Sequence, residues 1–153
     1  MKSWKEAEND VNRIRPDKEM AKSLLKMMKI RLKATESLDK NRFTSIVVEG
    51  YYEVIKEGIT ALMAMDGYKT LSHEALVVYL KEFYKEFAEH ETVFIDQLRQ
   101  LRNKIVYKGF FVEKDYLDRN EKQIMEIVAK IRKLLERPDG QSETNGNTKS
   151  KGT

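Results

Sequence analysis

The stretch LRNKIVYKG, residues 101–109, contains the side chains with the most evident capacity for chemistry. Arg102 and Asn103 interrupt the apolar end of a helical pattern, and Tyr107 and Lys108 follow shortly after them. A guanidinium cannot lose its charge, so placing it at the edge of an apolar layer is costly unless a carboxylate or a phosphate meets it. The sequence therefore predicts an anionic partner for Arg102.

Two kinds of partner are open for Arg102. A glutamate from the segment 43–66 can form a structural salt bridge with it, and the candidates are Glu49, Glu53 and Glu57. Alternatively, Arg102 lines a cleft that receives an anionic ligand. Tyr107 raises a matching question, because it is either a reactive group or a cover for the end of the core.

Several other chemistries are excluded by composition and spacing. The absence of cysteine removes disulfides, thiol nucleophiles and Cys-based zinc sites. Gly50 and Gly58 fall inside a helical pattern and belong to no phosphate-binding glycine loop. His73 and His90 are isolated from each other and lie in no metal-ligand motif, so both are interpreted as helix-cap or surface residues. We therefore expect no metal site and no cofactor.

The charge balance permits several classes of partner. Lys and Arg number 29 against 25 Asp and Glu, which gives a formal net charge of +4. This mild excess suits a nucleotide or nucleic-acid partner, and equally a lysine-rich solvated surface. No apolar run approaches the roughly 18 residues that span a bilayer, and the N-terminal residues lack the apolar stretch of a secretory signal. We expect a cytoplasmic protein without membrane contact.

The elements that position these residues are helices, because every periodic segment repeats at helical spacing. The expected helices cover residues 4–14, 17–38, 43–66, 72–87, 92–107 and 115–137. Ser3 and Glu6 form a capping-box pattern at the first helix, and Pro16 ends it. No strand is needed for any segment. Short links between amphipathic helices predict an all-α, up-and-down antiparallel bundle of four to five main helices with a short N-terminal helix.

The segment 43–66 is expected to be the central helix. Its apolar stripe has the most regular period: Phe43, Ile46, Val47, Gly50, Tyr51, Val54, Ile55, Gly58, Ile59 and Leu62. A glycine inside a helix costs about 1 kcal/mol relative to alanine, so close approach of neighbouring helices is expected at Gly50 and Gly58. In the preceding helix, the residues expected to face the core are Met20, Leu24, Met27, Met28 and Leu32.

The chain length suits a single domain, which we place at residues 1–137. Residues 138–153, PDGQSETNGNTKSKGT, contain none of the apolar side chains that form a core. Such a segment cannot bury enough surface to offset its ordering entropy, so a disordered tail is expected there.

Two parts of the sequence together resemble a known family. They are TSIVVEGYYEVIKEGITALMAMDGYKTLSHEALVVYL and, further along, LRQLRNKIVYKGFF. Over residues 20–136 the chain resembles the HEPN domains (higher eukaryote and prokaryote nucleotide-binding), especially prokaryotic members paired with minimal nucleotidyltransferases. The second part is the sharper match: the family signature is an arginine, usually followed by a polar residue, and then a histidine after a short interval. Arg102 and Asn103 match its opening.

The resemblance implies a helical bundle that dimerises, with the two arginine motifs across a shared cleft. Many members look like metal-independent endoribonucleases, in which the histidine moves protons at the ribose 2′-hydroxyl and the arginine holds the phosphate. Others bind nucleotides or act as a non-catalytic partner. On this resemblance, the phosphate-binding residues would be Arg102, Asn103 and Lys108, and the weak catalytic set would be Arg102, Asn103 and Tyr107.

Tyr107 stands where the resemblance leads us to expect the histidine. A tyrosine with a pKa near 10 is ionised only to roughly one part in a thousand at pH 7, whereas a histidine with a pKa near 6.5 can both accept and donate protons. Arg102 and Lys108 can lower the tyrosine pKa, but not by about three units in a solvated cleft. The favoured hypothesis is therefore a nucleotide- or RNA-phosphate-binding or regulatory module, dimeric and partnered with a nucleotidyltransferase, with ribonuclease activity weak or lost.

Two alternatives stay open. The first is a metal-independent endoribonuclease, the toxin of a toxin–antitoxin pair, in which Tyr107 replaces the histidine or another group such as His73 is brought in by folding. The second is a purely structural helical interaction protein, in which Arg102 pairs with a buried carboxylate and Tyr107 covers the end of the bundle. These three hypotheses are distinguished by whether Arg102, Asn103 and Tyr107 face an open groove in the dimer.

Overall fold

The computed structural model describes residues 1–138, so the disordered tail expected over 138–153 lies outside the described residues except for Pro138. The all-α class is confirmed. The helices are α1 (Trp4–Ala7), α2 (Lys18–Glu36), α3 (Thr44–Asp66), α4 (His73–Phe83), α5 (Glu89–Lys108) and α6 (Lys114–Leu135). A 3₁₀ turn, η1 (Glu8–Asp10), and two short strands, β1 (Val11–Arg13) and β2 (Tyr68–Thr70), complete the described part. None of the helices over residues 1–138 has the length and apolar character needed to span a bilayer.

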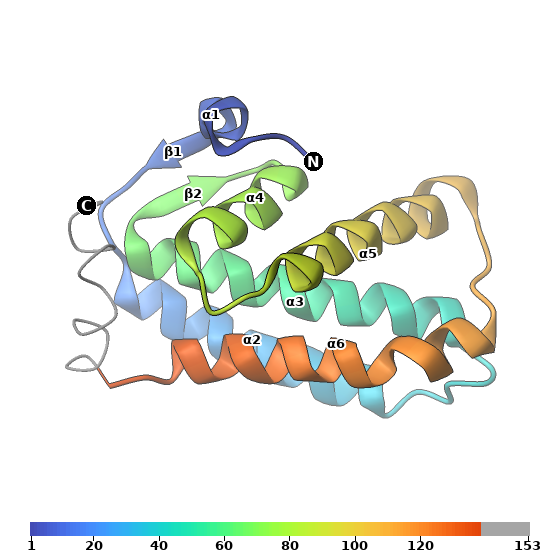
Figure 1. Ribbon diagram of the computed structural model, residues 1–153. Coiled ribbons are helices and arrows are strands. Elements are labelled where there is room, and N and C mark those ends of the chain that lie inside the picture. The colour runs from blue at the N-terminus through green and yellow to red at the C-terminus, as the bar shows by residue number, and fades with distance from the viewer. Residues whose placement is uncertain (139–153) are drawn as a thin grey trace.

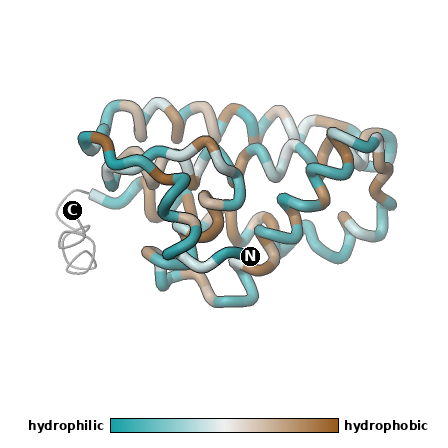
Figure 2. The backbone as a smooth tube through the Cα atoms, turned by 90° about the horizontal axis from the view of Figure 1, so that it is seen from above, coloured by the Kyte–Doolittle hydropathy of each residue, from teal (hydrophilic) through white to brown (hydrophobic). Residues whose placement is uncertain are grey.

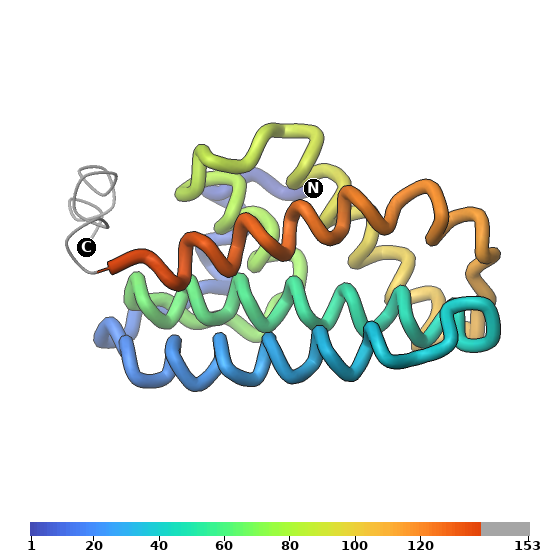
Figure 3. The backbone as a smooth tube through the Cα atoms, turned by 90° about the horizontal axis from the view of Figure 1, so that it is seen from below, coloured from blue at the N-terminus to red at the C-terminus, as the bar shows by residue number. Residues whose placement is uncertain are grey.

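The long helices form the expected up-and-down bundle. Figures 1 and 3 show α2, α3 and α6 as long neighbours, while α5 crosses α3 at an angle in Figure 1. Seen from above in Figure 2, hydrophobic and hydrophilic residues alternate along the tube, as amphipathic helices require. The helix α3 packs against α2, α4, α5 and α6, so it is the central helix that its sequence predicts.

Close helix packing explains both glycines inside α3. A Cβ atom on Gly50 would lie 2.5 Å from Oγ1 of Thr35 on α2, and one on Gly58 would lie 2.5 Å from Cγ2 of Ile131 on α6. The expectation of close approach is therefore confirmed at both positions. Gly67 ends α3 in the left-handed conformation, with φ of +94°.

The predicted core face of α2 is confirmed only in part. Met28 and Leu32 are buried as expected, but Met20 and Met27 are exposed, and Ala21, Leu25 and Thr35 are buried or packed in addition. Small side chains at two of these positions let α2 approach α3 closely, so size rather than hydrophobicity selects the face. Phe43 and Ile46, which were expected in the core stripe of α3, are also exposed.

The expectations for the N-terminus were wrong beyond Ala7. The predicted helix over residues 4–14 stops after one turn, and Val11 pairs with Thr70 in an antiparallel ribbon that the sequence did not predict. The backbone N–H of Ile14 donates to the carbonyl oxygen of Gly67 at 2.9 Å, which extends the attachment. Long-range pairing with β2 therefore replaces the local helical bonds. Trp4 meanwhile packs edgewise on Phe83, with ring centroids 5.0 Å apart.

Two helix ends also differ from the prediction. The helix α4 ends at Phe83, although Phe87 is buried as expected from its spacing. The helix α5 begins at Glu89, where the side chain of Glu91 accepts a hydrogen bond from the backbone N–H of Ala88 at 2.8 Å. This acidic first turn stabilises the helix start.

Candidate functional site

Arg102 lies in the C-terminal half of α5 and meets a carboxylate of α3. Its Nη2 atom is 3.2 Å from Oε2 of Glu53, and the two side chains are 15% and 20% exposed. Glu53 is one of the three glutamates that the sequence offered. The other carboxylate oxygen of Glu53, Oε1, is 3.0 Å from Nζ of Lys56. The carboxylate is thus shared between two cations.

The Arg102–Glu53 contact is incomplete as a salt bridge. The contact lacks hydrogen-bond geometry, and Glu53 Oε2 and Arg102 Nε are both buried without a hydrogen-bond partner. Arg102 Nη1 donates to Oδ1 of its neighbour Asn103 at 3.2 Å, and the guanidinium also interacts with the side chain of Tyr107. A buried donor left unsatisfied costs about 1–3 kcal/mol, so this guanidinium retains capacity for an added acceptor. The bidentate, closed contact expected of a purely structural pair is not the geometry observed.

Two tyrosine rings flank the guanidinium. Arg102 Cζ is 5.9 Å from the ring centroid of Tyr52 and 5.9 Å from that of Tyr107, within the range of cation–π attraction. Tyr52 is buried, whereas Tyr107 is 74% exposed and covers no part of the core. Burial opposes the charge of Arg102, but contacts with Tyr107 and Glu53 outweigh it and raise the pKa of Arg102 above its ordinary value. Arg102 stays a cation.

His73 joins the site from another element. It is the first residue of α4, whose start is capped by Ser72, and its Nδ1 lies 3.1 Å from the hydroxyl of Tyr52. The two rings stack with centroids 5.9 Å apart. Burial, with Lys56 and Arg102 nearby, lowers the pKa of His73, so the neutral imidazole is favoured at pH 7. Burial also raises the pKa of Tyr52, which keeps its hydroxyl protonated.

The remaining charges of the cluster are paired within α5. Asp96 is buried and accepts hydrogen bonds from Nε of Arg99 at 2.9 Å and from the Gln100 side chain at 2.8 Å. The charge of Arg99 is therefore paired with that of Asp96. Taken together, the cluster has three cations, Lys56, Arg99 and Arg102, and two carboxylates. Its formal excess is one positive charge, because Lys56 and Arg102 share the single carboxylate of Glu53.

Glu53 also connects the site to open surface. A surface groove of about 320 Å³ between α2 and α3 is lined by Glu53 together with residues that include Arg31, Glu49 and Ile46. Glu53 therefore lines the groove and also contacts Arg102. An anion that enters the groove would meet the negative charge of Glu53 before it reaches the guanidinium.

The predicted site residues are brought together only in part. Arg102 contacts Asn103 and Tyr107, but Lys108 follows Arg102 by six positions, which places it about 120° around the helix. Among the described residues no contact joins Lys108 to Arg102. The structure places Arg102 and Asn103 together, and the assignment of Lys108 to a phosphate site stays a prediction.

Sequence reasoning missed Tyr52 and Lys56 as parts of the site. Their signal was present in EGYYEVIKEG, where polar residues interrupt the apolar pattern of the central helix one turn apart. His73 was expected at a cap or on the surface; it does lie in the first turn of α4, yet it also contacts Tyr52. His90 is exposed in the first turn of α5.

No metal-binding arrangement accompanies the site in residues 1–138, where no group of three or more potential ligands is suitably placed. Comparison of the chain with family models, with curated proteins and with solved structures finds no match. Its function is therefore inferred from the chemistry of its own residues.

Proposed function

We propose that this protein is a HEPN-like module that binds a phosphate group of a nucleotide or an RNA at Arg102 and Asn103. The observation that carries the proposal is the incompletely satisfied guanidinium, whose buried Nε has no acceptor and whose contact with Glu53 is single. A phosphate oxygen is the acceptor that a guanidinium fork binds best. Ribonuclease activity is weak or lost, because Tyr107 occupies the position at which the resemblance leads us to expect the proton-transferring histidine.

The proposed module is a homodimer that joins through exposed apolar residues next to the site. This apolar rim comprises Phe43, Ile46, Tyr107, Phe110 and Phe111. Three of its members, Phe43, Ile46 and Phe111, also line one surface hollow of about 520 Å³. Contiguous exposed apolar surface is typical of an interaction site. A second copy seated on the rim would bring two Arg102 side chains toward one cleft.

Substitution of Arg102 tests the proposal directly. We expect Arg102→Gln to weaken binding of a fluorescently labelled single-stranded RNA, or of ATP, at least about tenfold, since one charge-assisted contact is lost. The matched control is Arg119→Gln on α6, whose guanidinium is exposed and pairs with Asp115. Unchanged affinity in Arg102→Gln, with circular dichroism showing an intact helical fold, would refute phosphate binding at this site. It would leave the structural helical interaction protein as the better explanation.

A metal-independent endoribonuclease is the second candidate, and the position of His73 favours it. In the tautomer that carries a proton on Nδ1, Tyr52 accepts that proton's hydrogen bond and Nε2 is free to take a proton from a ribose hydroxyl. The lowered pKa of His73 keeps this nitrogen unprotonated at neutral pH.

Cleavage of labelled RNA in the presence of EDTA tests the second candidate. Activity that rises through about pH 6 and disappears in His73→Ala, but not in His90→Ala, would favour the nuclease. An absence of cleavage between about pH 6 and 9 at high protein concentration would support the binding module instead.

The nucleotidyltransferase partner and the cytoplasmic toxin–antitoxin setting form part of the same proposal and are supported only by the motif resemblance. The partnership is tested by co-expressing this protein with a nucleotidyltransferase whose gene neighbours its own. Stable co-purification through size-exclusion chromatography is expected. Elution of the two proteins separately would remove that part of the proposal.

A further inference from the structure

A row of lysines follows one side of α2, away from the Arg102 site. Its members are Lys22, Lys26, Lys29 and Lys33, which recur at i, i+4, i+7 and i+11. Each stands one position after a residue of the core face, namely Ala21, Leu25, Met28 and Leu32. The row therefore borders the seam between α2 and its neighbours.

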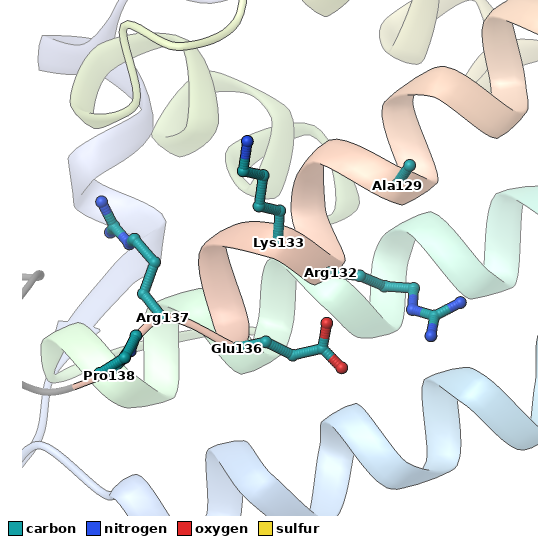
Figure 4. Close-up of a pocket in the computed structure, with 6 residues that line it drawn as sticks. All are labelled: Ala129, Arg132, Lys133, Glu136, Arg137 and Pro138. Atoms are coloured by element: carbon teal, nitrogen blue, oxygen red, sulfur yellow. The ribbon is translucent and has the colours of Figure 1, made fainter.

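The helix α6 adds cations across this seam. Arg132 lines a surface groove of about 440 Å³ together with Lys26, Lys29 and Lys33. It also lines the adjoining pocket of about 380 Å³ at the C-terminal end of α6, with Lys133 and Arg137. Figure 4 shows Arg132 and Lys133 leaving α6 in different directions: Glu136 lies on the side of α6 that faces α2, whereas Lys133 points away from α2. We call Lys26, Lys29, Lys33 and Arg132, which line the same groove, the basic groove.

Most of this charge is not neutralised by the protein. Lys29 pairs with Glu136 at 2.6 Å, and this pair bridges α2 and α6. Lys26, Lys33 and Arg132, by contrast, form no ion pair within 4 Å among the described residues, although Arg132 is close enough to Glu136 to contribute, after Lys29, to the lowered pKa of that carboxyl. Glu36 is the other carboxylate that lines the groove. An excess of unpaired cations on one surface attracts a polyanion.

We propose that the basic groove binds the phosphate backbone of a nucleic-acid strand, as a second site separate from Arg102. The length of the groove supports a strand over a mononucleotide, because seven residues of α-helix separate Lys26 from Lys33 and span about 10 Å, while Arg132 lines the same groove from α6. Lysines contact phosphates as flexible point charges and need no fixed geometry, so the binding is independent of base sequence.

The packing of α2 argues against an anionic membrane as the occupant. A helix that lies in a membrane interface exposes a broad apolar face beside its basic residues. The core residues of α2 are instead buried against the bundle. Met20, Met27 and Ile30 are exposed on α2, but of these three only Ile30 lines the groove. A nucleic-acid backbone requires charge alone, which the groove supplies.

The test compares the full-length chain with two triple variants of equal charge. The groove variant is Lys26→Gln/Lys33→Gln/Arg132→Gln. The control variant is Lys5→Gln/Lys69→Gln/Lys81→Gln, whose lysines are exposed on α1, β2 and α4 and form no ion pair among the described residues. The measurement is the affinity for a labelled single-stranded RNA of about 20 nucleotides, at salt concentrations from about 50 to 200 mM.

We expect the groove variant to lose at least about tenfold in affinity at low salt. The slope of log affinity against log salt should become shallower by about 2, since each phosphate contact on a single strand contributes about 0.7. The control variant should keep the slope of the unmodified chain. Equal slopes in the two triple variants would overturn the proposal, and Lys26→Gln/Lys33→Gln provides the same test with the half-buried Arg132 retained.

Two further measurements distinguish RNA binding at the basic groove from RNA binding at Arg102 and from binding to a membrane surface. Arg102→Gln should lower RNA affinity while leaving most of the salt slope, so failure at Arg102 and failure at the basic groove give different results. Vesicles containing phosphatidylserine should not sediment the protein at concentrations that saturate RNA. Sedimentation that is abolished in the groove variant would assign the groove to lipid and overturn the proposal.

Discussion

At the scale of single residues, Glu53 determines how available Arg102 is to a ligand. Its carboxylate lies 3.0 Å from Lys56 and 3.2 Å from Arg102, and it borders the groove between α2 and α3. A negative charge in that position competes with any anion for the same guanidinium. It also lowers the cost of keeping Arg102 partly buried when no ligand is bound.

Neutralising Glu53 should therefore strengthen phosphate binding. We expect Glu53→Gln to raise the affinity for nucleotide or RNA several-fold, because the competing charge is removed while side-chain size is kept. Titration calorimetry measures the change. Glu57→Gln is the matched control. Glu57 lies on the same helix as Glu53 and also pairs with an arginine, Arg31 of α2, at 3.0 Å. A loss of affinity in Glu53→Gln would mean that the carboxylate positions Arg102 rather than competing for it.

The buried setting of His73 should make stability depend on pH. Its pKa in the folded protein lies below the unfolded value near 6.5, so the unfolded chain binds more protons as the pH falls below about 7. The free energy of unfolding should decrease on acidification from about pH 7 to 5, and less so in His73→Gln. Urea denaturation at both pH values measures this. An equal decrease in both proteins would contradict the lowered pKa.

The site could be predicted from sequence only as far as Arg102, its neighbour Asn103 and a set of three possible glutamates. The choice of Glu53 depends on the crossing of α3 and α5, which local periodicity does not specify. The approach of His73 to Tyr52 depends on where the turn after α3 places α4. Tyr107 was expected to serve either as a reactive group or as a cover, and its high exposure excludes the cover.

At the scale of elements, small residues fix how closely the helices pack. A Cβ atom on Gly58 would overlap Ile131 on α6 at 2.5 Å and approach the Met28 side chain on α2 at 3.0 Å. The close packing of both α2 and α6 against α3 therefore requires a residue without a side chain at position 58. The gain in helix propensity from alanine cannot offset this overlap.

We accordingly expect Gly58→Ala to lower the free energy of unfolding by about 1–3 kcal/mol. Urea denaturation monitored by circular dichroism measures it. Gly109→Ala is a useful comparison, because nothing lies within 4 Å of its added Cβ and any cost there comes from φ of +63° alone. Equal or greater stability in Gly58→Ala would show that α6 can shift without penalty.

The helices themselves were largely predictable, and the errors share one cause. The stripes of α5 and α6 follow hydrophobic period, and the structure buries Leu98 on α5 and Ile127 on α6 as expected. The face of α2 was predicted only in part and the β1 strand was missed, because both depend on partners distant in sequence. Thr35 is buried against Gly50, and Val11 pairs with Thr70. Neither contact leaves a local signal.

At the scale of the whole molecule, the apolar rim should control association. Phe111 is 82% exposed, so Phe111→Glu should not disturb the fold but should convert the proposed dimer to a monomer. Sedimentation velocity measures the change in mass. Leu71→Glu is the matched control, because Leu71 is 91% exposed between β2 and α4 and lies outside the rim. A dimer that survives Phe111→Glu but not Leu71→Glu would place the interface elsewhere.

Because α3 is central, its backbone amides should exchange their hydrogens with solvent more slowly than those of the outer elements. Amides in its middle turns are covered by four other helices, so they should exchange with deuterium only when the whole domain unfolds. Amides of α1 and β1 are held by one short ribbon, a few backbone bonds and the packing of Trp4 and Ala7 on α4, so they should exchange through local opening. We therefore expect slow exchange along α3 and faster exchange in the N-terminal segment, which mass spectrometry of exchanged peptides can separate.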